Sequence, residues 1–276
     1  MNWRAIRAIM RKDLRVVLTN RMVWVPMIIV PLFLMVLLPV ALVLAPTLDP
    51  DTFASGEMML DDFGPMLTAL PEPIRDRLAN MDSTQQWVYL ATTQLFAPMF
   101  LILPIMLASI VASDSFAGER ERGTLEPLLY TPVSDGELFA GKVLAALVPA
   151  VGLGLVGFAL NVVVVNAAGY RLMGGLFFPN VDWVLMVLFL GPACALIGLG
   201  VTVLVSSRAK TVTGAQQASG ALVLPVVLLM VGQLAGAFYF GGGVILGATA
   251  VALVIGLALV WLGARTFGRG ELVARI

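Results

Sequence analysis

Few residues in this chain could carry chemistry, and one group of them matches part of a phosphate-binding motif. Gly136-Glu-Leu-Phe-Ala-Gly141-Lys142 fits the first seven positions of GxxxxGK[ST], but Val143 stands where a hydroxyl would reach a magnesium ion. No strand pattern precedes this segment, and an apolar run follows it. The chain has no histidine, and Cys194 is its single cysteine. We therefore expect no nucleotide site, metal centre or catalytic residue in this chain.

A second group of polar side chains forms the segment Asp114–Lys142, between two long apolar runs. Charges alternate in sign over Glu119–Arg122, and Gly123 is predicted to end the helix that carries them. Thr124 is suited to cap a following short helix. A membrane protein that keeps such a segment on one side presents a surface to something in water.

The second half of this segment is predicted to contain that short helix and the start of the next span. Leu125, Leu128 and Leu129 share one helical face, and Thr131-Pro132 ends it. Ser134 and Glu137 have the spacing of a capping box. The pattern indicates a short amphipathic helix across the end of the bundle, although an ordinary solvated loop fits the same residues.

The composition predicts that lipid surrounds much of the protein. Of 276 residues 59% are hydrophobic and only 12% are charged, and the mean hydropathy is +0.96. Soluble domains carry about 25% charged residues. Six runs are long enough to cross a bilayer as helices: Met22–Ala45, Gln94–Ala112, Leu138–Val165, Trp183–Val205, Ala215–Phe238 and Val244–Ala264. The predicted fold class is an all-α integral membrane protein.

The cations predict the orientation of these six spans. Three arginines, Arg75, Arg77 and Arg171, fall on one side, and the other fourteen cations fall on the opposite side. Because lysine and arginine concentrate in cytoplasmic segments, we expect both termini and the segment Asp114–Lys142 in the cytoplasm. The fourteen are Arg4, Arg7, Arg11, Lys12, Arg15, Arg21, Arg120, Arg122, Lys142, Arg208, Lys210, Arg265, Arg269 and Arg275.

Two segments outside the spans have predicted structures of their own. Residues Asn2–Asn20 place apolar side chains at helical spacing between cations, which predicts an amphipathic helix in the membrane interface. The acidic, proline-rich loop Pro46–Val88 lies on the outer side, and its pattern predicts short helices at Glu57–Leu70 and Ile74–Met81.

The interiors of the spans contain no Asp, Glu, Lys or Arg, which argues against an ion-coupled transporter that runs by itself. Asn161 and Gln233 are polar residues inside spans; they either join helices by hydrogen bonds or line a translocation path. Glycines at four-residue spacing, such as Gly243 and Gly247, suit close helix packing within the chain or between two copies.

The string from Phe116 to Lys142 resembles the cytoplasmic loop of type-2 ATP-binding-cassette (ABC) transporter permeases, which are export-class permeases with six spans. The basic N-terminus and the large loop after the first span agree, so the resemblance covers nearly the whole chain. The family often has short re-entrant helices after the fifth span, for which Phe238–Gly243 leaves little room. The matching positions are Glu119, Glu121, Gly123, Thr124, Glu126, Leu128, Leu129, Thr131, Pro132, Gly141 and Lys142.

The resemblance implies one permease domain over residues 1–276, with an interfacial helix at 1–21, an extracytoplasmic loop at 46–88 and a cytoplasmic coupling loop at 114–142. Two permeases, as a homodimer in the inner or plasma membrane, would form the substrate path of an exporter. ATP and magnesium would bind to separate ATPase subunits. The residues implied in coupling are Glu119, Arg120, Glu121, Arg122, Gly123, Thr124, Glu126, Leu128, Leu129 and Pro132.

Two other functions fit the residues less well. A membrane anchor or assembly subunit that transports nothing would share the spans and the docking loop. An intramembrane enzyme would need paired acids, or a nucleophile with a base, within the spans, and the sequence offers neither. The expected partners are an ATPase subunit, a second permease and membrane lipid, and no nucleic acid.

Overall fold

Every regular element in the described part of the chain is helical. The computed structural model describes residues 2–49, 51, 57–124, 133–207, 209 and 211–266. The α-helices are α1 (Trp3–Thr19), α2 (Arg21–Leu32), α3 (Leu38–Leu48), α5 (Glu57–Ala69), α6 (Glu72–Ala79), α7 (Ser83–Leu90), α8 (Phe96–Phe100), α9 (Ile102–Ser113), α10 (Glu119–Glu121), α12 (Asp135–Met173), α13 (Val181–Leu185), α14 (Gly191–Ser206), α15 (Val212–Gly220), α16 (Val223–Leu234) and α17 (Gly242–Thr266). Four π-helical segments connect some of them: η1 (Phe33–Leu37), η2 (Ala91–Leu95), η3 (Asp114–Gly118) and η4 (Met186–Leu190).

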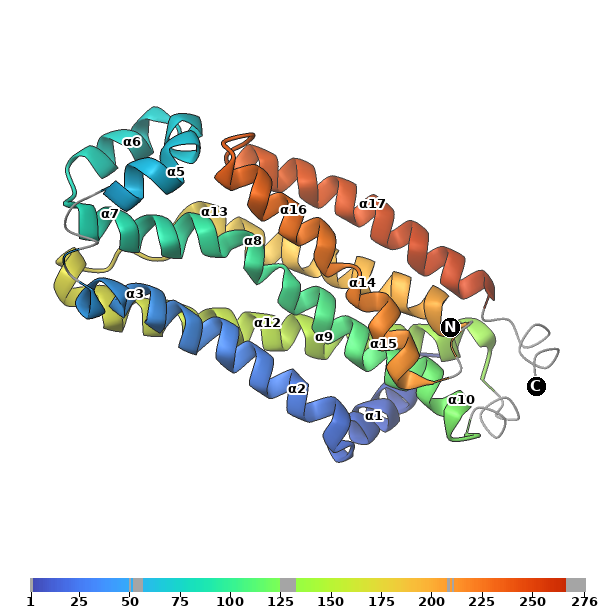
Figure 1. Cartoon of the computed structure of the whole chain (residues 1–276). Coiled ribbons are helices and arrows are strands. Elements are labelled where there is room, and N and C mark those ends of the chain that lie inside the picture. The colour runs from blue at the N-terminus through green and yellow to red at the C-terminus, as the bar shows by residue number, and fades with distance from the viewer. Residues whose placement is uncertain are drawn as a thin grey trace.

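These elements join into six continuous helices that are long and apolar enough to cross a membrane, which confirms the predicted number of spans. The second helix is longer than the predicted span Gln94–Ala112, because it runs from Ser83 to Glu121. Figure 1 shows them as an elongated bundle, with α5 and α6 at one end and α1 and α10 at the other. The start of α1 and the end of α17 lie at the same end. The six helices are Val23–Leu48, Ser83–Glu121, Asp135–Met173, Val181–Ser206, Val212–Leu234 and Gly242–Thr266.

The second span is the centre of the bundle. In its most apolar stretch 78% of the residues are buried, compared with 17% for the fifth span and 22% for the sixth. The outer spans turn many large apolar side chains outward, such as Phe33, Leu228 and Val254. An apolar environment rather than water must cover these surfaces, since water would leave them unfavourably exposed.

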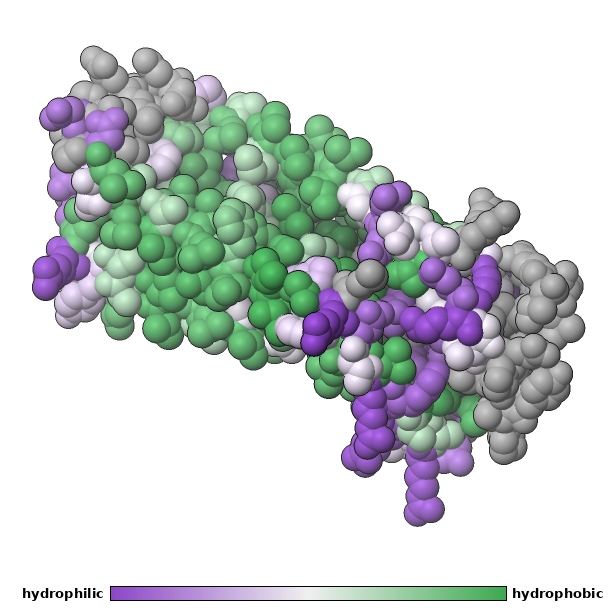
Figure 2. All heavy atoms as spheres, turned by 60° about the horizontal axis from the view of Figure 1, so that its bottom comes forward, coloured by the Kyte–Doolittle hydropathy of each residue, from purple (hydrophilic) through white to green (hydrophobic). Residues whose placement is uncertain are grey.

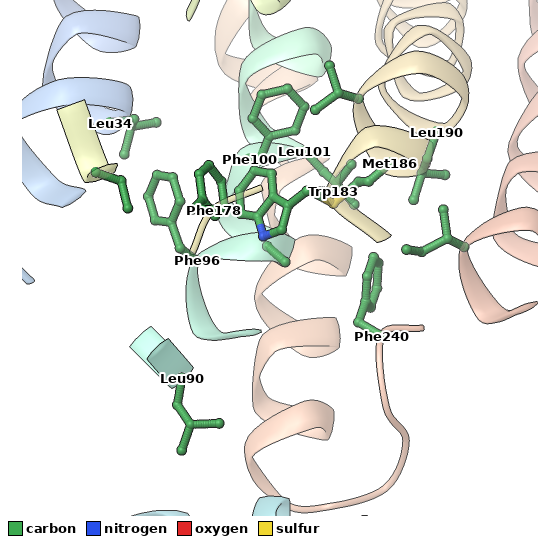
Figure 3. Packing of buried hydrophobic residues seen from close by; sticks show 14 of the residues in the cluster. Leu34, Leu90, Phe96, Phe100, Leu101, Phe178, Trp183, Met186, Leu190 and Phe240 are labelled. Atoms are coloured by element: carbon green, nitrogen blue, oxygen red, sulfur yellow. The ribbon is translucent and has the colours of Figure 1, made fainter. Parts of the chain in front are cut away.

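An aromatic cluster (Figure 3) lies around α8 and α13, in the half of the bundle nearer α5 and α6 (Figure 1). Trp183 is 1% exposed and packs against Phe96, Phe100, Phe158 and Phe178, with ring centroids 5.1–5.9 Å apart. The rings come from the second, third and fourth spans and the loop before the fourth. The cluster therefore fixes how these segments lie against one another.

The sequence-based helix predictions for the outer loop are also confirmed, as α5 and α6. The chain between the last two spans, residues 235–241, forms a turn without a helix, in which Gly236 has φ of 70°. A side chain at Gly236 would collide with the Pro65 carbonyl of α5. This turn has no re-entrant helix and instead holds the loop helices against the bundle.

Some glycines let two helices of this chain pack closely, and others do not. A Cβ at Gly198 in α14 would lie 2.5 Å from the Ile105 carbonyl oxygen, so α9 and α14 touch there along their backbones. Gly243 and Gly247 meet nothing within 4 Å. Among the described residues, that pair does not pack one helix against another.

Candidate functional site

The predicted coupling loop leaves the bundle at a well-defined helix end. Gly123 has φ of 66°, its N–H donates to the Arg120 carbonyl at 3.1 Å, and the Thr124 N–H donates to the Glu119 carbonyl at 2.9 Å. This pair of bonds is the Schellman motif, in which a glycine takes the left-handed conformation. The predicted helix end at Gly123 is confirmed. Glu126, Leu128, Leu129 and Pro132 lie outside the described residues.

The loop ends at the predicted capping box of Ser134 and Glu137, where α12 begins. The Ser134 Oγ accepts from the Glu137 N–H at 3.3 Å, and the Ser134 N–H donates to Glu137 Oε2 at 3.2 Å. The two bonds satisfy backbone groups at the first turn of α12. Both ends of the loop are thus fixed by hydrogen bonds that its own sequence encodes.

A buried group of charges lies directly behind these two ends. Lys142 of α12 is 0% exposed, and its ammonium donates to Glu119 Oε2 and to the Ser115 carbonyl, each at 2.6 Å. It also lies 3.5 Å from Asp13 Oδ2 of α1. Glu119 and Asp13 are each 3% exposed. Because a buried ammonium is costly without partners, Lys142 holds these acids together.

Lys12 completes this group from the solvent side. Its ammonium pairs with Glu119 Oε1 and lies 3.2 Å from Asp13 Oδ1. Partial burial lowers the pKa of Lys12, but the hydrogen bond and charge of Glu119, with those of Asp13, outweigh it, so this pKa lies above its ordinary value. Two ammonium groups and two carboxylates therefore cancel. We call Lys12, Asp13, Glu119 and Lys142 the ionic cluster.

We call residues Asp114–Thr124, where the coupling loop leaves the bundle, the loop stem. Further polar contacts join it to the neighbouring helices. Arg122 donates to Asp114 Oδ1 at 2.9 Å, and Asn20, at the end of α1, donates to the same oxygen at 3.2 Å. Arg120 donates at 3.1 Å to the last carbonyls of α14, and Glu121 Oε2 accepts from the first N–H of α15 at 2.8 Å. The stem is thereby connected to α1, α12, α14 and α15.

The ionic cluster borders a small cavity between α1 and the stem. Its volume is about 130 Å³, and Asp114, Ser115, Arg122 and Thr124 line it together with Lys12, Asp13 and Glu119. In the part of the chain that the structure describes, no group of three metal-ligating side chains occurs. Every acid of the cavity already has a basic partner, so the arrangement is suited to joining helices.

The partial phosphate-binding pattern has a packing role in this structure. Residues Gly136–Lys142 form the first turns of α12. A Cβ at Gly141 would lie 2.8 Å from the Cβ of Ile9, so the glycine lets α1 approach α12 closely. Lys142 points into the ionic cluster. The glycine and the lysine are thus accounted for by contact with α1.

Sequence reasoning placed Glu119 in the loop and counted Lys142 as a cytoplasmic cation, but it missed their pairing and missed Asp13 and Ser115. One signal was present. Asp13 continues the spacing of Ile6, Ile9 and Val17, which form the buried face of α1. An acid on the apolar face of a basic helix predicts a buried partner.

Asn161 reaches a backbone group that a proline leaves without a donor. Its amide donates to the Met35 carbonyl at 3.0 Å, and the residue is 0% exposed. Met35 is four residues before Pro39, and proline has no N–H to offer the carbonyl at that position. The Asn161 Oδ1 has no partner among the described residues. The nitrogen therefore joins the first and third spans, which is the hydrogen-bonding alternative predicted for this residue.

Gln233 repeats the same arrangement between the second and fifth spans. Its amide donates to the Gln94 carbonyl at 3.1 Å, and Gln94 is four residues before Pro98. Nearby, the Tyr239 hydroxyl donates to Asp182 Oδ2 at 2.7 Å. Burial, then the bond to Asp182, raises the pKa of Tyr239 above its ordinary value. These bonds tie the fifth span and the turn after it to the rest of the bundle.

The six long apolar helices define a multi-pass helical membrane protein. A family model described as ABC-2 family transporter protein matches residues 7–247. The chain therefore belongs to the ABC-2 type transporter permease family, which confirms the resemblance found in the loop. A search of curated proteins found no match.

Proposed function

We propose that this chain is the permease subunit of an ATP-driven exporter that works as a homodimer with two separate ATPase subunits. The two ends of the coupling loop support the proposal. Both are capped, and the ionic cluster joins them to α1. A force applied to a loop held in this way reaches the first three spans together.

The exposed part of the loop is the proposed docking surface for the ATPase. Glu121, Arg122, Gly123 and Thr124 are exposed, whereas Glu119 is turned into the bundle. Glu119 then transmits the movement, and the residues after it make the contact. With the loop and both termini in the cytoplasm, ATP and magnesium stay in the partner.

The test is co-purification of the tagged chain from its native membrane in a mild detergent, with ATP hydrolysis measured on the eluate. We expect an ATPase subunit at about equal stoichiometry. Glu126→Arg should abolish its recovery without preventing membrane insertion, because this reverses a charge in the short helix that the sequence predicts within the coupling loop.

The matched control is Glu72→Arg, the same charge change in the first turn of α6 at the opposite end of the bundle. It should leave the ATPase bound. If both variants keep a fully active ATPase, the loop does not couple. If the wild-type complex survives the detergent and hydrolyses ATP but moves no substrate in vesicles, the chain is an assembly subunit.

A further inference from the structure

Helix α1 has one face that nothing in the described structure covers. Arg4, Arg7, Arg11 and Arg15 are all exposed, and no ion pair joins them to any acid within the described residues. At about 100° per residue they fall within an arc of about 80°. The buried face, centred on Ile9 and Asp13, lies opposite. We call these four residues the arginine stripe.

Exposed apolar residues accompany the arginine stripe. Leu18 is 70% exposed and falls in the middle of the same arc, and Trp3 is 56% exposed at the other end of the helix. A surface that alternates arginine with tryptophan and leucine suits the boundary between lipid headgroups and hydrocarbon, where each type of side chain finds its own environment. An aqueous or purely acidic surface would leave the apolar ones without contact.

The position of α1 puts the stripe at that boundary. Only Asn20 separates α1 from α2, which continues into the first span, and Ile28, Ile29 and Phe33 of that span are more than half exposed. Figure 2 shows the hydrophilic residues gathered at the end of the molecule beside the hydrophobic belt, with long side chains projecting away from the body. A helix at this level meets phospholipid headgroups.

We propose that the arginine stripe of α1 binds anionic phospholipid headgroups. Guanidinium groups form paired hydrogen bonds with phosphate oxygens, and no carboxylate in the described part of the chain competes for the stripe. Asp13 and Lys12, on other faces of the helix, are engaged in the ionic cluster. Lipid bound to one face of α1 is therefore connected through the other face to Glu119. The proposal needs only membrane insertion and is independent of the ATPase.

The test uses the full-length chain, purified in an uncharged detergent and titrated with dioctanoyl phosphatidylglycerol, with dioctanoyl phosphatidylcholine as the neutral probe. Bound lipid is counted by native mass spectrometry. We expect tighter binding of phosphatidylglycerol, weakened by added salt. The double variant Arg7→Gln/Arg11→Gln should weaken it roughly 30-fold, since each cation near an anionic surface contributes about 5-fold.

The control variant is Arg75→Gln/Arg171→Gln, which removes two exposed arginines from the opposite end. It should bind phosphatidylglycerol within about 2-fold of the wild type. Equal loss in both variants, or equal binding of the two lipids by the wild type, would overturn the proposal. So would unchanged lipid binding by Arg7→Gln/Arg11→Gln together with loss of a co-purifying ATPase, which would make the stripe a protein-docking surface.

Discussion

The two ends of this bundle bury polar groups in different ways. Near α1, paired charges hold three helices together, with Lys142 and Glu119 2.6 Å apart and both buried. Toward α5 and α6, neutral amides of Asn161 and Gln233 donate to backbone carbonyls, beside an aromatic cluster around Trp183. The first region depends on exact charge balance, whereas the second depends on single hydrogen bonds and shape.

This difference predicts which contacts change when the protein changes conformation. Separating the ionic cluster would leave uncompensated charges in a poorly solvated place, which costs several kcal/mol. Exchanging one amide bond for another costs about 1 kcal/mol. We therefore expect α1, the loop stem and the start of α12 to move as one body, and rearrangements to occur among the spans that amides connect.

The largest effect should come from Lys142→Met. It leaves Asp13 and Glu119 with only Lys12 to balance them, and removing one partner of a buried ion pair costs about 3–5 kcal/mol. The measurement is the free energy of unfolding in detergent micelles. The double variant Lys142→Met/Glu119→Gln should recover at least half of the loss. Equal stability of Lys142→Met and wild type would show that the two regions do not differ in this way.

An intermediate loss of stability is expected from Gly198→Ala, at a position between the two regions. Gly198→Ala places a Cβ 2.5 Å from the Ile105 carbonyl oxygen, and such overpacking costs about 1–3 kcal/mol. Gly247→Ala gains the same helix propensity but meets open space. The difference between the two melting temperatures isolates the clash. If Gly198→Ala is as stable as Gly247→Ala, the α9–α14 contact is looser than described.

The smallest effect should come from Gln233→Leu, at about 0.5–2 kcal/mol, because the Gln94 carbonyl loses its side-chain donor and keeps only the Phe96 N–H. Pro98→Ala restores an N–H that can bond to that carbonyl within the helix. In the Pro98→Ala background, Gln233→Leu should therefore cost much less. A thermodynamic cycle of the four proteins measures this coupling. A coupling of zero would mean that the amide does not replace the missing N–H.

Local signals in the sequence predicted much of the fold. Apolar length located six spans, Gly123 located the end of the helix that carries Glu119–Arg122, and Ser134 with Glu137 located the start of the third span. The end of the second span was placed too early, at Ala112, because the helix continues to Glu121. Each of these depends on residues within one or two turns of helix. The resemblance in the loop then led to the family that the comparison with family models confirmed.

The ionic cluster could not be predicted in the same way. Its members come from positions 12 and 13, 119 and 142, and their pairing follows only from how α1 crosses the bundle. In the sequence, Glu119 and Lys142 looked like parts of a solvated loop. Likewise, Pro39 and Pro98 revealed that carbonyls would be left free, but Asn161 and Gln233 could not be matched to them without the packing of the spans.

The deep burial of the second span also bears on how the protein is made. This span leaves the ribosome before the third to sixth spans that later cover it, so the bilayer is its first solvent. Thr92, Thr93, Gln94, Ser109 and Ser113, all buried in the finished bundle, must then sit in lipid with only intrahelical bonds. The segment tolerates this because the mean hydropathy of its most apolar stretch is 2.4. Its polar side chains are therefore in the membrane before the helices that later bury them have been synthesised.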